Sequence, residues 1–313
     1  MIDPKNLAAS EIWAITAYFN PIGFRRRLAN YRLFRQHLQI PLLAVELAFG
    51  EDFELDAGDA DILLQLRGRD VMWQKERLLN LALEALPARC TKVAWLDCDL
   101  IFSDPDWAGR TSAALDRHAL VQPFSLVHRM PQHWRPGDPD AGADVMRSVG
   151  YALESGMSMD ECIYGDGEDV KCARGMAWAA RRELLAGYGL FDLGILGGGD
   201  AIFFRSAFGY FAEAGRRLHL SGNGAERFRA WAQPFHEAVQ GDVSHVPGDL
   251  THLWHGALSD RRYGKRFEEF AAFDFDPSED IALDDSGAWR WDSPKSEMHD
   301  FVRRYFDGRR EDG

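Results

Sequence analysis

The sequence predicts an α/β fold in which a mostly parallel central sheet is flanked by helices. Short runs of apolar and β-branched residues alternate along the first half with segments whose apolar residues recur at helical spacing. These runs are apolar throughout rather than at every second position, which is typical of strands covered on both faces. Two carboxylates, Asp97 and Asp99, directly follow one of the runs, and open α/β sheets bind ligands beyond the carboxyl ends of their strands.

The first hundred residues give the order strand, helix, strand, strand, helix, strand. The first strand is broken by the turn residues Asn20-Pro21-Ile22-Gly23, and Pro87 ends the second helix. Strands are predicted at 12–18, 41–47, 61–66 and 91–96, and helices at 24–38 and 71–86. This order is typical of an α/β sandwich.

The second half of the sequence is less regular. Residues 131–172 are rich in Gly, Pro, Asp and Met, which predicts a long loop or a small insertion. This segment and residues 218–250 are candidates for loops that shape a binding site or close over a ligand. Elsewhere we expect a strand at 175–180, a helix from Arg181 to about Gly187, and helices at 201–216 and 295–306. No internal repeat or low-complexity linker divides the chain, so one domain is predicted.

Composition disfavours several classes of protein. The chain has 313 residues, of which 46% are hydrophobic and 27% charged, as in globular proteins. A formal net charge of −13 disfavours nucleic acid and anionic membranes as partners. No apolar run approaches the ~20 residues of a membrane helix, and the amino-terminal segment lacks the pattern of a signal peptide. The four cysteines form no CxxC pair, so we expect reduced thiols and a cytoplasmic protein.

Asp97 and Asp99 are the first candidate site. Their carboxylates can hold a hard divalent cation such as Mg²⁺ or Mn²⁺, which readily bridges protein to a diphosphate. Carboxylates at strand ends also form simple turns or caps. His252 and His255, three residues apart, add imidazoles suited to a Mn²⁺-like ion. The alternative for this pair is a packed aromatic segment with incidental histidines.

Gly197-Gly198-Gly199-Asp200 is the second candidate site. The glycines let the backbone approach a ligand closely and adopt positive φ. Asp200 falls at a predicted helix start, which favours an ionised carboxylate that can act as a general base, although a plain N-cap has the same pattern. Lys75 and Arg77, at another helix start, either contact a diphosphate or form a solvated basic face.

Three common signatures are not present in the sequence. No segment matches the P-loop pattern GxxxxGK[ST], the dinucleotide-binding pattern GxGxxG or the zinc-protease pattern HExxH. P-loop proteins, Rossmann-type dinucleotide-binding proteins and zincin-type proteases are therefore disfavoured.

The order of the motifs resembles that of the GT-A fold glycosyltransferases, and specifically the family 2 or β-1,4-galactosyltransferase-like branch. The resemblance covers about residues 12–266 and implies a GT-A (nucleotide-diphospho-sugar transferase) domain over 1–266. Its donor-binding half would be about 1–105 and its acceptor half about 106–266, with 267–313 as an extension packed on the same domain. The matching segments are Asn20-Pro21 with Arg25, Arg26 and Arg27; Lys75 to Asn80; Asp97 and Asp99; Gly197 to Asp200; and His252 with His255.

The resemblance also implies residue roles in a hexosyltransferase that uses one Mn²⁺ or Mg²⁺ ion and a nucleotide sugar, with a UDP-sugar favoured. Asp99 and His255 would bind the metal, His252 would be a further ligand, and Asp97 would contact the ribose or the metal through water. Asp200 would deprotonate the acceptor hydroxyl in a single in-line displacement that inverts the sugar. The other donor-binding residues would be Asn20, Pro21, Arg25, Lys75 and Gly198, with Lys75 and the arginines at 25–27 contacting the diphosphate and nucleoside.

Two positions depart from the family pattern. Gly199 stands where the family has a glutamate that helps to bind the acceptor sugar, and Leu196 stands where an aromatic residue is usual. Trp178 or Trp254 is then a candidate for stacking on a carbohydrate or other hydroxyl acceptor.

Two other functions stay open. A catalytically silent protein would bind the nucleotide sugar and the metal without turnover, because the acidic residue is missing at position 199. A sugar-nucleotide pyrophosphorylase has a related fold, but its Gly-rich signature after the first strand is not found in Asn20-Pro21-Ile22-Gly23.

Overall fold

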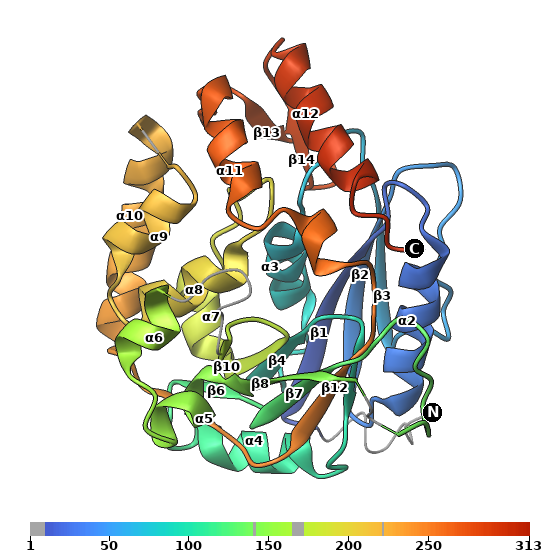
Figure 1. Ribbon diagram of the computed structural model, residues 1–313, viewed down its shortest axis with the longest axis vertical. Helices are drawn as coiled ribbons and strands as arrows, with labels where there is room; N and C mark the ends of the chain where they lie inside the picture. Colours follow the sequence, from blue (N-terminus) through green and yellow to red (C-terminus); the bar gives the residue numbers. More distant parts are fainter. Residues whose placement is uncertain (1–9, 140–141, 165–171, 221) are drawn as a thin grey trace.

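A seven-stranded sheet forms the centre of the computed structural model, which describes residues 10–139, 142–164, 172–220 and 222–313 (Figure 1). Neighbouring strands are parallel except on both sides of β10, which runs antiparallel to β4 and β6. The prediction of a mostly parallel sheet flanked by helices is therefore confirmed. The strand order is β11 (Val243–His245), β6 (Leu120–Gln122), β10 (Ala177–Arg181), β4 (Lys92–Leu96), β1 (Ile12–Phe19), β2 (Leu42–Ala48) and β3 (Ile62–Arg67).

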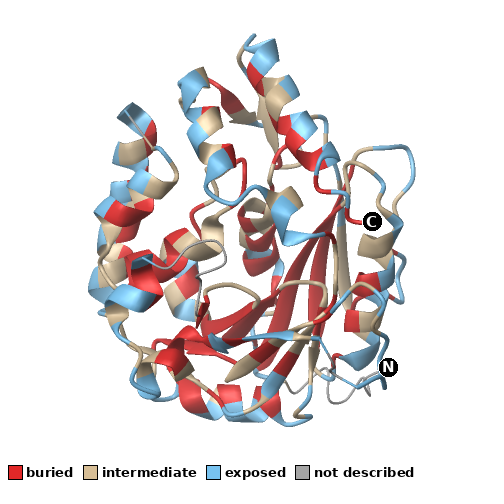
Figure 2. Ribbon diagram, viewed as in Figure 1, coloured by how far each residue is buried: buried red, intermediate tan, exposed pale blue. Residues whose placement is uncertain are grey.

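Both faces of this sheet are buried, which explains the continuous apolar runs. In β1, Ile15 and Phe19 belong to one hydrophobic cluster and Ala14 and Tyr18 to the other, because successive side chains point to opposite faces. Figure 2 shows the central strands as buried along their length. These strands are therefore apolar along their length because neither face of the sheet is open to water.

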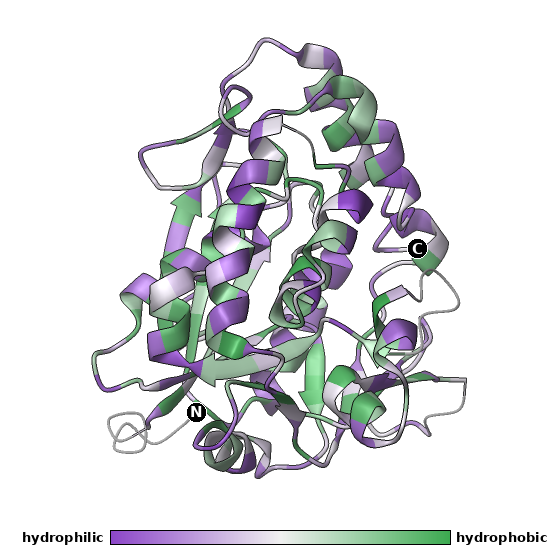
Figure 3. Ribbon diagram, turned by 90° about the vertical axis from the view of Figure 1, so that its left-hand side faces the viewer, coloured by the Kyte–Doolittle hydropathy of each residue, from purple (hydrophilic) through white to green (hydrophobic). Residues whose placement is uncertain are grey.

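Helices cover the two faces unequally. Figure 3, which views the molecule from the side of α9 and α10, shows hydrophobic residues along the sheet and mixed colours on the helices. One face is covered by α2 (Arg25–His37) and α4 (Trp107–Leu115). The other is covered by α3 (Lys75–Ala85), α7 (Arg182–Tyr188), α8 (Gly199–Ala207), α10 (Gly222–Val239) and α12 (Ser296–Asp307).

A second sheet of five strands brings the late histidine segment to the end of β4. In it, β12 pairs antiparallel with β5, and His252 lies opposite Leu100. Because β5 begins directly after Asp99, this register places His252 beside the two carboxylates. The strand order is β5 (Leu100–Phe102), β12 (Asp249–His252), β7 (Leu126–Arg129), β8 (Asp144–Ser148) and β9 (Cys172–Ala173).

Several expected elements differ in the structure. Residues 131–172 are not one long loop, since they contain β8, α5 (Val149–Glu154), α6 (Met159–Tyr164) and the start of β9; 140–141 and 165–171 lie outside the described residues. Residues 218–250 are not a lid loop either, because α10 and β11 occupy most of them. The helix expected at 71–86 begins only at Lys75.

The helix expected at 201–216 is divided into α8 and α9 (Phe211–Arg217). Gly209 separates them with φ of 81°, and a Cβ built there would lie 3.0 Å from the ring of His236. The break therefore follows from a backbone conformation and a close contact that glycine accommodates.

The C-terminal part adds α11 (Lys265–Phe270), the hairpin β13 (Ile281–Leu283) and β14 (Trp289–Trp291), and α12. Met298 and Phe306 of α12 belong to the same hydrophobic cluster as Ile15 of β1. The chain then returns to the start of α2, where the C-terminus lies (Figure 1). In the described part of the chain, no helix has the length and apolar character needed to cross a bilayer.

The aromatic core beneath α8 generates a stability prediction. Phe203 is 4% exposed, and its ring centroid lies 5.1 Å from that of Trp95 and 5.0 Å from that of Phe235. Phe203→Ala is expected to lower the free energy of unfolding by about 3–5 kcal/mol, because it removes a buried ring and leaves a cavity. The control Val145→Ala, at a side chain 48% exposed, is expected to change it by less than about 0.5 kcal/mol. Urea denaturation measures both, and equal losses would contradict the assignment of this core.

Candidate active site

The candidate site begins where β4 ends. Asp97 follows Leu96, the last residue of β4, and its backbone N–H donates to the carbonyl of Met176 at 2.8 Å. The carbonyl of Asp99 accepts from the backbone N–H of Leu253 at 2.9 Å. These bonds fix the segment between the two sheets, with both carboxylates at the carboxyl end of a central parallel strand.

Asp99, His252 and His255 form a possible metal-binding set. One ligand atom from each lies within 4.8 Å of the others. The Nε2 of His255 lies 3.3 Å from Oδ2 of Asp99 and 3.1 Å from Nε2 of His252, and the Nε2 of His252 lies 3.7 Å from Oδ1 of Asp99. The structure thus brings together three of the residues that the sequence nominated as metal ligands.

The donor atoms fit a divalent cation. Oδ1 of Asp99 is buried and has no hydrogen-bond partner among the described residues. Burial, aided by Arg261, lowers the pKa of His252 to about 3 and that of His255 well below its usual value, so both rings are neutral, the form in which imidazole binds a metal. Burial and the charge of Asp97 raise the pKa of Asp99 to about 7. A bound cation would lower the pKa of Asp99 and so oppose the effects of burial and of Asp97 on that carboxyl.

Lys75 joins this cluster to the glycine-rich segment. As the first residue of α3, it places its Nζ 2.6 Å from Oδ1 of Asp97 and 3.1 Å from Oδ2 of Asp200. Burial disfavours the ammonium, but Asp200 and Asp97 outweigh it and raise the pKa of Lys75 well above its usual value. Lys75 is therefore a permanent cation shared by two carboxylates.

Asp200 is the second residue of α8, so the predicted helix start is correct. The preceding Gly198 has φ of 91°, and a Cβ built there would lie 2.9 Å from Leu218. A Cβ built at Gly175 would lie 2.7 Å from Oδ2 of Asp200. Burial raises the pKa of Asp200, Lys75 opposes the change and Asp97 adds to it.

Glu76 fills the space in front of Gly199. A Cβ built at Gly199 would lie only 1.9 Å from Oε1 of Glu76, whose Oε2 accepts from the indole N–H of Trp73 at 2.9 Å. Burial raises the pKa of Glu76 to about 8. A carboxyl group therefore stands next to position 199 although that residue is glycine. Sequence reasoning gave Glu76 no role because nothing local shows that α3 packs against the start of α8.

A small pocket opens between α3 and α8 beside these groups. Its polar lining is Lys75, Glu76 and Asp200, and its aromatic lining includes Phe191 and Trp231. The suggestion that Trp178 stacks on an acceptor is wrong, because that ring is fully buried against Phe203. The ring of Trp254 lies under the guanidinium of Arg26, with 5.5 Å between the guanidinium carbon and the ring centroid.

The residues expected to contact the nucleotide lie at the turn between β1 and α2. Asn20 closes this turn: its Oδ1 accepts from the N–H of Phe24 at 2.9 Å, and its Nδ2 donates to Glu54 at 2.9 Å. Pro21 is part of the turn, which Gly23 completes with φ of 77°. The side chain of Arg25 is 94% exposed. Within this group, Asn20 has a clear local structural role.

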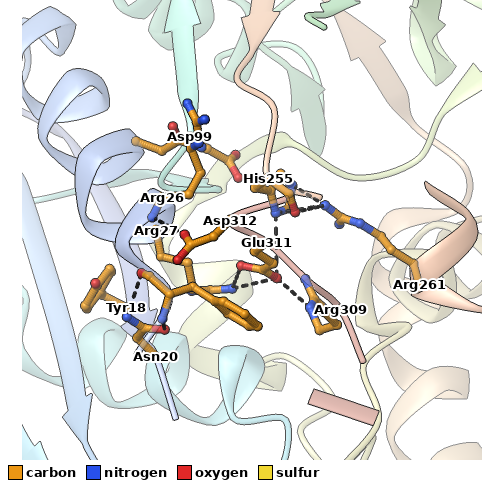
Figure 4. Close-up of polar contacts among 12 residues, drawn as sticks. Tyr18, Asn20, Arg26, Arg27, Asp99, His255, Arg261, Arg309, Glu311 and Asp312 are labelled. Carbon is orange, nitrogen blue, oxygen red and sulfur yellow. Dashed lines mark hydrogen bonds and ion pairs between the residues drawn. The ribbon is translucent and has the colours of Figure 1, made fainter. Parts of the chain in front are cut away.

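Arg27 is buried against a residue that the sequence did not nominate. Glu311 pairs with Arg27 at 3.0 Å and with Arg309 at 2.5 Å, and its Oε1 lies 3.9 Å from Nδ1 of His255 (Figure 4). The next residue, Asp312, accepts from the backbone N–H of Arg26 at 2.8 Å, at the start of α2. A carboxylate is favoured at a helix N-terminus. The C-terminal segment thus forms one wall of the candidate site, although no motif or spacing marks it in the sequence.

Comparisons with known proteins do not assign a family. No family model and no curated protein matches the chain. The chain is similar to several solved structures at 9–15% sequence identity. One is the glucosyl-3-phosphoglycerate synthase of Mycobacterium tuberculosis in complex with Mn²⁺, UDP and phosphoglyceric acid, with 14% identity, 94% of this chain and 93% of that chain covered, and a TM-score of 0.40.

Two other solved structures are similar to the chain at comparable levels. The mannosyl-3-phosphoglycerate synthase of Rubrobacter xylanophilus has 11% identity, covers 92% of this chain and 87% of its own, and has a TM-score of 0.41. S. aureus TarS 1-349 in complex with UDP-GlcNAc has 11% identity, covers 96% of this chain and 72% of its own, and has a TM-score of 0.39. Likenesses at this level do not assign an activity, and the β-1,4-galactosyltransferase-like branch stays a prediction.

The buried Glu311 generates a prediction about stability and pH. Glu311→Gln leaves Arg27 and Arg309 without their shared carboxylate. It is expected to lower the free energy of unfolding by about 3–5 kcal/mol at neutral pH. The folded-state pKa of Glu311 lies well below its ordinary 4.5, because Arg27 and Arg309 outweigh burial. Its contribution is therefore fully present above pH 4.5 and is lost as the pH falls below that value. Chemical denaturation between pH 7 and pH 3 should show the gap between wild type and variant closing on acidification.

The matched control is Glu297→Gln, at an exposed glutamate on α12. Its effect is expected to stay within about 0.5 kcal/mol at every pH. If the free energies of unfolding of wild type and Glu311→Gln differ little at pH 7, or differ more in acid, the carboxylate does not stabilise the two arginines.

Proposed function

We propose that this protein is a metal-dependent, inverting glycosyltransferase that moves a sugar from a nucleoside-diphosphate donor to an acceptor hydroxyl. One observation carries the proposal: two groups of residues meet at the carboxyl end of the central strand β4. Asp99, His252 and His255 form a possible metal-binding set. Beside it, the carboxylate of Asp200 is paired with Lys75. Asp97 connects them through its contact with Lys75.

On the donor side, Asp99, His252 and His255 would hold one Mn²⁺ or Mg²⁺ ion. When bound, that ion supplies positive charge that stabilises the departing diphosphate. Asp97 would contact the ribose or the metal through water, and Lys75 would lie close enough to the site to oppose negative charge that grows on the leaving group. A UDP-sugar is favoured by the resemblance of the motif order.

On the acceptor side, Asp200 would act as the general base. The acceptor oxygen forms a bond to the anomeric carbon while the bond from that carbon to the phosphate oxygen breaks, and its electron pair leaves with the diphosphate. The acceptor proton passes to a carboxylate oxygen of Asp200. A single displacement of this kind inverts the configuration. Lys75 helps to keep Asp200 ionised, because it opposes the effect of burial on the pKa of that carboxyl.

The groups around Asp200 suit a hydroxyl-rich acceptor bound at the mouth of the small pocket. The partly exposed ring of Trp231 offers aromatic surface, and Glu76 offers a carboxyl group close to the proposed base. Aromatic faces pack on apolar surface, and carboxyl oxygens bond hydroxyls. The proposal is therefore a carbohydrate or another polyhydroxyl compound as acceptor.

Asp200→Asn tests the base. It removes the proton acceptor and keeps the shape of the residue, so transfer should fall by roughly 100-fold or more. Binding of UDP with Mn²⁺, measured by calorimetry, should stay within about threefold of wild type. Transfer is measured as UDP released from a panel of UDP-sugars with mono- and disaccharide acceptors.

Asp300→Asn, at an exposed aspartate of α12, is the control and should retain full transfer. Normal transfer by Asp200→Asn would refute the assignment of the base. A wild-type protein that binds UDP with Mn²⁺ but turns over no donor in the panel would instead be a silent nucleotide-sugar-binding protein.

His255→Ala tests the metal set. Loss of even an indirect partner of a ligand typically costs about 10–100-fold in metal affinity, so loss of a direct ligand should weaken Mn²⁺-dependent UDP binding by at least that much. His37→Ala, at an exposed histidine of α2, should leave it unchanged. Unchanged affinity in His255→Ala would remove this histidine from the proposed site.

A further inference from the structure

Arg261 is a cation beside the candidate metal ligands for which the proposed mechanism has no role. It ends the short helix η2 (Leu258–Arg261), six residues after His255. One terminal nitrogen of its guanidinium lies 2.8 Å from Nδ1 and 2.7 Å from Nε2 of His255 and donates to the carbonyl of that residue at 3.1 Å. Figure 4 shows the side chain extended toward His255 from the opposite side to Arg27.

The partners of Arg261 differ from those of the neighbouring arginines. Arg27 and Arg309 share Glu311, and Arg262 pairs with Glu269 at 2.5 Å. Among the described residues, the guanidinium of Arg261 hydrogen-bonds only to His255, and no carboxylate lies within ion-pair distance of it. Its charge is therefore directed at the site, where it acts on the Asp99 carboxylate without forming an ion pair with it.

A cation in this position does not help a metal to bind. A divalent ion at Asp99, His252 and His255 and the Arg261 guanidinium would repel each other at such short range. The two charges are compatible when an anion lies between them. The chemistry that satisfies both is a diphosphate, whose oxygens can bind a divalent ion and accept the paired N–H donors of a guanidinium.

To reach a diphosphate bound at the metal set, the Arg261 side chain would have to move away from His255, and the backbone around it permits this movement. Gly256 and Gly264 bound the segment with φ of 100° and 78°, and Arg262 has φ of 49°. No residue of η2 is buried. The segment therefore has little packing to lose when its arginine changes partner.

We propose that Arg261 is a diphosphate-binding residue of the donor site, which leaves His255 and donates to the phosphate oxygens when the metal and the donor are bound. This inference rests on the proposed function, because it assumes the metal set at Asp99, His252 and His255. It adds a ligand for the phosphates that the motif order did not supply, and it assigns η2 to the donor site.

The test compares Arg261→Gln with Arg262→Gln, a matched loss of charge at the next residue, whose partner is Glu269. Two affinities are measured for each: that for Mn²⁺ alone, by electron paramagnetic resonance, and that for inorganic pyrophosphate in the presence of Mn²⁺, by calorimetry. Pyrophosphate isolates the diphosphate from the base and the sugar. Arg261→Gln should bind Mn²⁺ alone as tightly as wild type or more tightly, since a competing cation is gone. Its affinity for pyrophosphate should fall by roughly tenfold or more, the size of a lost charged hydrogen bond.

Three outcomes would overturn the inference, and they differ from one another. A loss of pyrophosphate affinity no greater than that of Arg262→Gln would show that Arg261 does not contact the phosphates. Equal losses for Mn²⁺ alone and for pyrophosphate would show that Arg261 only supports His255. A wild-type protein that binds no Mn²⁺ would remove the proposed function, and this inference with it.

Discussion

One buried ammonium, that of Lys75, connects the two halves of the candidate site. Asp97 and Asp200 come from distant parts of the chain, and each places a carboxylate oxygen about 3 Å or less from Nζ. Removing charges from water costs several kcal/mol per ion, a cost that the attraction between paired charges can offset, and this chain already carries a formal net charge of −13. Without Lys75, the carboxylates at the end of β4 and at the start of α8 would repel each other or take up protons. The position of α3, which begins at Lys75, therefore determines whether the site can form.

The second constraint is strand register. Pairing of β12 with β5 sets His252 opposite Leu100, so a shift of one residue would turn the imidazole to the other face of the sheet. The C-terminal segment adds a third, since Glu311 holds Arg27 and Arg309 beside His255. Residues from the beginning, the middle and the end of the chain therefore all contribute to one cluster.

The sequence predicts those features that local patterns determine. Strands β1, β2, β3 and β4 follow from apolar runs that two-sided burial requires, and the meeting of Asp99 with His252 and His255 agrees with the rule that ligands bind at strand ends. For residues 131–172, composition left a long loop and a small insertion open, and the loop alternative is wrong because Gly-rich and Asp-rich segments also form short strands and helices. Glu76, Arg261 and Glu311 were missed because their roles arise only from tertiary contacts between segments far apart in the sequence.

The measurement that tests the central claim most directly is a thermal-shift panel of UDP, GDP, CMP and dTDP, each with and without Mn²⁺. A ligand at ~100 times its dissociation constant stabilises the folded state by about 2.7 kcal/mol. The proposed site predicts a shift with a nucleoside diphosphate, UDP foremost, that appears only when Mn²⁺ is present. No shift with any of the nucleotides, or an equal shift without the metal, would contradict a metal-dependent donor site at Asp99, His252 and His255.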